Sequence, residues 1–124
     1  MSAAAKLVVV VVALEHLWFL VLEMFLWAKP IGLRTFRMSI EQARGSAALA
    51  ANQGLYNGFL AAGLAWSLLA PPEQASALAV FFLACVIVAA VFGAATVSRR
   101  ILVVQGMPAL VGLALVLSSG RHHS

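Results

Sequence analysis

Four apolar runs, each close to the roughly 20 residues that cross a bilayer as a helix, constrain this chain more than any other feature. The runs cover residues 7–28, 47–70, 75–97 and 101–119. Hydrophobic residues make up 64% of the chain and charged residues 10%, which is more apolar surface than a soluble domain of this length can bury. The sequence predicts an all-α polytopic membrane protein, a single domain over 1–124 with four transmembrane helices in a compact bundle.

The first run lies near the start of the chain, where a secretory signal would also lie. It is longer than a signal's apolar region, contains Glu15, His16 and Glu23, and ends in Trp27-Ala28-Lys29-Pro30 rather than at a cleavage sequence. We therefore expect this segment to be retained as the first span.

Basic residues are distributed unevenly between the two ends of the runs. Positively charged loops of membrane proteins stay in the cytoplasm, and two loops here are rich in such residues. This predicts an inner (plasma) membrane protein with both termini outside and with the first and third loops in the cytoplasm. The net charge of the chain is +4, and we expect its partner to be the anionic leaflet of the membrane rather than nucleic acid. The first and third loops carry Lys29, Arg34, Arg37, Arg44, Arg99 and Arg100, whereas the opposite side carries only Lys6 and Arg121.

The first loop has an amphipathic pattern over residues 33–44. Leu33, Phe36, Ile40 and Ala43 recur at helical spacing, with charged residues between them. We expect a short interfacial helix between spans one and two. Two interpretations stay open: a helix that rests on lipid headgroups, or a lid whose arginines meet an anionic group of a ligand.

A polar stretch, Asn52-Gln53-Gly54-Leu55-Tyr56-Asn57-Gly58, interrupts the second run. Polar groups in hydrocarbon are costly unless they face protein, water or a ligand. On a helical wheel the four polar side chains form one arc, which we expect to face the bundle interior. Gly54 and Gly58 belong to an adjoining arc of small residues that allows close approach of another helix.

Polar residues of all four runs fall at a similar depth near the cytoplasmic ends. Glu23 in the first run, Thr96 in the third and Gln105 in the fourth match the depth of the polar stretch, and His16 lies about two turns deeper on the face of Glu23. Pro108 is expected to kink the fourth span and to free a backbone carbonyl there.

Glu23 and His16 are the candidate catalytic residues, with Tyr56 as a possible proton donor. A carboxyl group in a low-dielectric environment can exchange a proton near neutral pH, as a general acid or base must. The alternative for Glu23 is an ion pair with Arg44, Arg99 or Arg100. The alternative for His16 is a neutral bridge between helices. Glu15 points away from this face, and its role stays open.

The amides of the polar stretch are candidate substrate-binding residues. Asn52, Gln53 and Asn57 offer donors and acceptors that would orient a substrate oxygen, and the alternative is interhelical hydrogen bonding. No metal site, cofactor, dinucleotide or phosphate-binding motif is expected, nor any nucleic-acid partner. The single cysteine, Cys85, is expected to be a small packing residue.

Several strings along the chain resemble a known family. Glu15-His16, Glu23 to Trp27, Asn52 to Ala61, Gly93 to Thr96 and Gln105 to Ala109 are similar to the small integral-membrane family catalogued as domain of unknown function 1304. The resemblance implies a compact four-helix membrane protein and brings no established activity. Trp27, Thr96 and Gln105 match the pattern as well and, like the residues named above, are site candidates on physical grounds only.

Three functions are compatible with these residues. The leading hypothesis is a membrane-embedded acid–base enzyme, an isomerase, cyclase or hydrolase-like protein acting on a small lipophilic molecule. The second is a small transporter or proton-coupled carrier that works as a homo-oligomer, with the small-residue arc of the second run as a subunit interface. The third is a non-catalytic lipid binder. Substrate, reaction and oligomeric state are not determined by the sequence.

Overall fold

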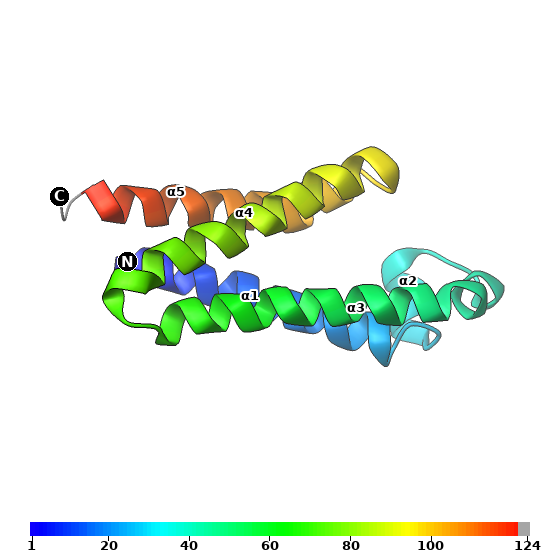
Figure 1. Ribbon diagram of the computed structural model, residues 1–124. Helices are drawn as coiled ribbons and strands as arrows, with labels where there is room; N and C mark the ends of the chain where they lie inside the picture. The colour runs from blue at the N-terminus through cyan, green and yellow to red at the C-terminus, as the bar shows by residue number, and fades with distance from the viewer. Residues whose placement is uncertain (122–124) are drawn as a thin grey trace. The chain divides into compact units, whose positions relative to one another are not determined.

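The computed structural model describes residues 1–121, with side chains as far as Ser119, and this part of the chain is entirely helical (Figure 1). The helices are α1 (Ala3–Met24), α2 (Pro30–Phe36), α3 (Ile40–Leu69), α4 (Pro72–Thr96), a π-helix (Leu102–Gly106) and α5 (Met107–Arg121).

Three stretches of the described chain are helices long and apolar enough to cross a membrane: Ala3–Met24, Pro72–Thr96 and Leu102–Ser119. They correspond to the first, third and fourth predicted spans. The second predicted span, 47–70, coincides with α3 as far as Leu69. At 30 residues α3 is long enough to cross a membrane, but the polar stretch makes it less apolar than the other three helices. The described chain thus has three apolar helices of membrane-spanning length, rather than the four predicted.

The helix expected over 33–44 is not a single helix. Helix α2 ends at Phe36, and Arg37 follows in the left-handed conformation, with φ of 53°. A new helix begins at Ile40. The backbone amide of Gln42 donates to the Ser39 hydroxyl at 3.1 Å, and the backbone amide of Ser39 donates to the Gln42 side-chain oxygen at 2.9 Å. This reciprocal cap is a strong helix start, so the apolar positions on either side of it belong to different helices.

The chain forms two compact units. One contains residues 1–13 and the chain from Leu60 onward. In it α4 packs against α5 and the π-helix, and Figure 1 shows α4 and α5 side by side. Its buried core is apolar and is formed by Ala5, Val9, Val12, Leu64, Ala79, Leu83, Val86, Ala109 and Val116.

The predicted irregularity at Pro108 takes the form of the π-helix. The Met107 amide donates to the carbonyl of Leu102, five residues earlier, so the chain is wound more loosely just before the proline. Pro108 has no amide proton to donate, and such wide turns often occur where a regular helix is interrupted. Gln105 and Gly106 are buried in this segment.

The second unit is Leu14–Phe59, which holds the end of α1, the turn after it, α2 and the first two-thirds of α3. Its helices approach closely because α3 has glycine at the contact. A β-carbon added to Gly58 would lie 2.5 Å from the Leu20 side chain, and one added to Gly54 would lie 3.3 Å from the Leu20 carbonyl oxygen. The predicted role of these glycines is confirmed, with α1 as the partner helix.

Candidate functional site

The centre of the Leu14–Phe59 unit is a hydrogen-bonded pair of polar side chains, Glu23 and Asn57. Glu23 lies in the last turn of α1 and Asn57 in the middle of α3, one residue from Gly58. The Asn57 amide nitrogen donates to Oε1 of Glu23 at 2.5 Å, and the two residues are 5% and 8% exposed. Glycine at 54 and 58 brings the helices close enough for these short side chains to meet.

Within residues 1–121, the hydrogen bond that the structure shows for the Glu23 carboxyl group uses one of its two oxygens, Oε1. The ion pair with Arg44 that the sequence left open does not form among these residues, and a neutral amide is the partner of Glu23 instead. A carboxyl group can accept such a bond through one oxygen and exchange a proton through the other.

His16 is completely buried on α1. It precedes Glu23 by seven residues, so it lies about 10 Å along the same face of the helix. The His16 ring packs edge-on against Phe19, with centroids 5.3 Å apart, and Nδ1 lies 3.9 Å from Oε1 of Glu15. The burial agrees with its predicted place on the inner face of α1.

The expectation that the whole polar arc of α3 faces inward is wrong. Asn57 is buried against α1, whereas Asn52, Gln53 and Tyr56 are exposed, Tyr56 by 56%. The physical reason is that the glycine face makes the contact with α1 and only Asn57 borders that face.

Trp27 joins the three helical segments at the end of α1. Its indole Nε1 donates to the Ser46 hydroxyl of α3 at 3.1 Å, and its ring lies 4.7 Å from that of Phe36 on α2. In Figure 1, α2 accordingly lies beside the first turns of α3. Trp27 thus fixes the turn that follows Glu23. Ser46 is a contributor that no motif in the sequence indicated, and the amphipathic pattern that contains Phe36 did not predict its contact with Trp27.

Thr96 and Gln105 belong to the other compact unit. Thr96 is the last residue of α4; it is exposed, and its hydroxyl donates to the Phe92 carbonyl at 2.7 Å. Gln105 is buried in the π-helix. A role for either residue beside Glu23 stays a prediction.

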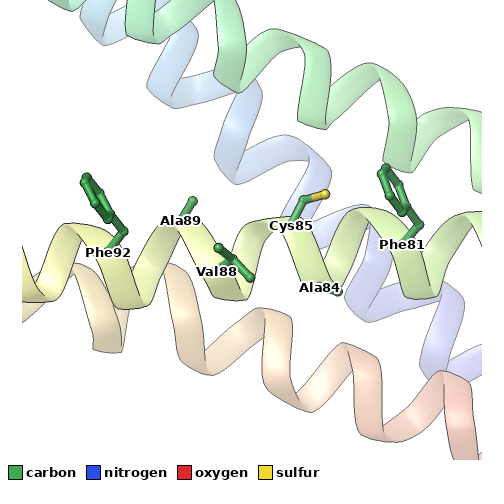
Figure 2. A pocket seen from close by; sticks show the side chains of 6 residues that line it. All are labelled: Phe81, Ala84, Cys85, Val88, Ala89 and Phe92. Atoms are coloured by element: carbon green, nitrogen blue, oxygen red, sulfur yellow. The ribbon is translucent and has the colours of Figure 1, made fainter.

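An open apolar hollow of about 500 Å³ lies on α4, and Figure 2 shows the side chains along it. It offers no group for acid–base chemistry except the half-buried, free Cys85 thiol. We therefore place the candidate site at Glu23 and Asn57, not here. The lining residues are Phe81, Ala84, Cys85, Val88, Ala89 and Phe92.

Comparison with known proteins identifies the family but no activity. The chain is 30% identical over 104 residues to the uncharacterized protein YpaA of Lactococcus lactis subsp. lactis (strain IL1403), a match that covers 82% of this chain and 87% of YpaA. No solved structure matches the chain. A family model described as "Protein of unknown function (DUF1304)" matches residues 10–117, and the chain therefore belongs to this family.

Proposed function

We propose that this protein is a membrane-embedded acid–base enzyme that acts on a small lipophilic molecule, with Glu23 as the group that transfers the proton. The observation that carries the proposal is the buried Glu23 carboxyl group, held by Asn57 through one of its oxygens. A base of this kind removes a proton from one atom of the substrate and returns it to another, as in isomerisation or cyclisation, or directs water in a hydrolysis.

The site in this proposal is smaller than the one inferred from the sequence. Asn57 orients the carboxyl group, and Trp27 holds the turn beside it through Ser46 and Phe36. His16, on the same face of α1, is the proposed second proton-exchanging group. Asn52, Gln53 and Tyr56 are left out because they are exposed on another face of α3.

The proposed setting is the inner membrane, with both termini outside, the first and third loops cytoplasmic, and α3 as a fourth crossing helix. The three apolar helices and the concentration of arginine and lysine in 29–44 and at 99–100 support this topology. In this topology Glu23, one residue before the end of α1, would lie near the cytoplasmic surface. The substrate would enter from the cytoplasmic leaflet.

Native mass spectrometry of gently purified protein, with extraction of any bound molecule, tests the proposal. Glu23→Gln keeps an oxygen that can accept the Asn57 bond but cannot accept a proton as a base, so it should retain substrate instead of product. We expect wild type and variant to carry small molecules that differ chemically. Glu41→Gln, which removes an exposed carboxyl group at the start of α3, is the matched control and should resemble wild type.

Other outcomes identify the other functions. The same unchanged molecule in wild type and Glu23→Gln would overturn the enzyme and favour a lipid binder. Protein that carries no molecule and moves a lipophilic cation or proton in vesicles would favour a carrier.

A further inference from the structure

One face of α3 remains exposed although the opposite face packs on α1. Leu49, Asn52, Tyr56 and Phe59 are all exposed, Leu49 by 75% and Phe59 by 56%. We call the face formed by these four residues the seam. At 100° per residue the seam is centred about 150° from the buried face that holds Gly54 and Asn57. The residues of the seam therefore have no part in the α1 contact or in the proposed reaction.

The spacing of the seam is that of a helix-pairing surface. Positions 49, 52, 56 and 59 are separated by three, four and three residues, the alternation by which two helices interlock over successive turns. Gly45, four residues before Leu49, continues the series, and a β-carbon there would meet no atom within 4 Å. The series therefore extends over about four turns of α3.

The charge and polarity of the seam residues are compatible with a second copy of the seam as partner. No formally charged residue occurs from Leu49 to Phe59, so two copies of the seam do not repel each other. The Asn52 carboxamide presents a positive N–H edge and a negative carbonyl oxygen, so the same group on a second copy is electrostatically complementary to it. Copies that insert into a membrane in the same direction pair through parallel helices around a twofold axis, where each residue faces its own counterpart.

We propose that two copies of this chain associate through this seam of α3, with Asn52 facing Asn52 of the second copy and setting the register. Asn52 is the one carboxamide among the seam positions, and such a side chain fixes the alignment and the number of helices, because a shift separates it from its counterpart. The glycine stripe that the sequence suggested as a subunit interface is used within one chain at Gly54 and Gly58, and the subunit contact lies on the other side of the helix.

Cysteine cross-linking in native membranes tests the proposal, since Cys85 is the chain's single cysteine and Cys85→Ala removes the background. Asn52→Cys and Tyr56→Cys, each in that background, should give a covalent dimer under mild oxidation, with a mass of twice the chain. The matched control is Leu55→Cys, which is exposed beside Tyr56 but about 80° from the seam. The control should stay monomeric.

A second measurement does not depend on a new cysteine. Copies with two different tags, expressed together, should co-purify as wild type and should lose most of that association as Asn52→Asp, which places two carboxylates opposite each other. Asn52→Cys, Tyr56→Cys and Asn52→Asp each change an exposed side chain, so these variants should fold as wild type, and their elution as single species in detergent checks this. The proposal is overturned if neither seam cysteine cross-links, if Leu55→Cys cross-links equally, or if differently tagged wild-type copies do not co-purify.

Discussion

Two of the helix contacts that contain glycine differ in what surrounds the glycine. Where α3 meets α1, Gly54 and Gly58 lie against Leu20, and the buried pair Glu23 and Asn57 lies at the same contact. Around Gly112 of α5, a β-carbon would meet the side chains of Val8 and Leu83, at 3.2 to 3.5 Å, in an apolar core.

The second contact shows that close approach of helices in this chain needs no polar pair. Small residues allow backbones to approach, and dispersion between the surrounding side chains holds them together. The carboxyl group and amide at the α1–α3 contact are therefore not required for packing as such. Because close packing does not require a buried carboxyl group, Glu23 is a candidate for proton transfer.

Gly54→Leu should have the largest effect on stability. The nearest atoms include the backbone carbonyl of Leu20 and Cβ of Glu23, which cannot move aside without moving α1. We expect a loss of about 3 kcal/mol, seen as a large fall in the melting temperature in detergent. Ala48→Leu, at an exposed position of the same helix, is the control, and equal melting of the two variants would show that α1 and α3 do not pack as described.

Asn57→Leu should come next, because it leaves the buried Glu23 carboxyl group without its partner. The expected cost is about 1–2 kcal/mol in thermal unfolding. The double variant Glu23→Leu with Asn57→Leu should recover part of this loss, since no polar group is then stranded. A double variant that is less stable than Asn57→Leu alone would mean that the pair is structural, and would weaken the contrast with the α5 contact.

Ser39→Ala should cost about 1 kcal/mol, the usual value of a helix N-cap. The change removes the hydroxyl that accepts the Gln42 amide and should loosen only the start of α3. Hydrogen exchange should rise over residues 40–44 and stay unchanged at Asn57. Faster exchange that reaches Asn57 would show that the polar contact depends on the start of the helix.

Gly112→Ala should have the smallest effect, within about 0.5 kcal/mol of wild type. The neighbours of the new methyl group are the ends of the Val8 and Leu83 side chains, which can shift, and alanine gains up to about 1 kcal/mol of helix propensity over glycine. A melting temperature as low as that of Gly54→Leu would show that both contacts are equally rigid and remove the distinction between them.

The sequence predicted the helical elements well where one physical effect dominates. Apolar length alone located α1, α4 and the segment from 102 to 119. The pair Gly54 and Gly58 predicted a close helix contact because few other residues allow one. The sequence could not say that α1 is the partner, since that depends on contacts between segments far apart in the chain.

The errors have equally specific causes. A helical wheel gives the angles between Asn52, Tyr56 and Asn57 but not which arc faces the neighbouring helix, so all were expected inside. The break at Arg37 was missed because the pattern of apolar residues continues across it. The Ser39 to Gln42 cap was readable in the sequence, and it would have placed the start of α3 correctly.

Helix α3 does not end where its partner does. Residues 40–56 precede Asn57, which is bonded to the last turn of α1, and at 1.5 Å per residue they extend about 26 Å past that bond. Within this extension Ser46 is bonded to Trp27, so a displacement of the start of α3 reaches the turn that follows Glu23. A spin label at Glu41, far from any reacting atom, would consequently report movement at the site.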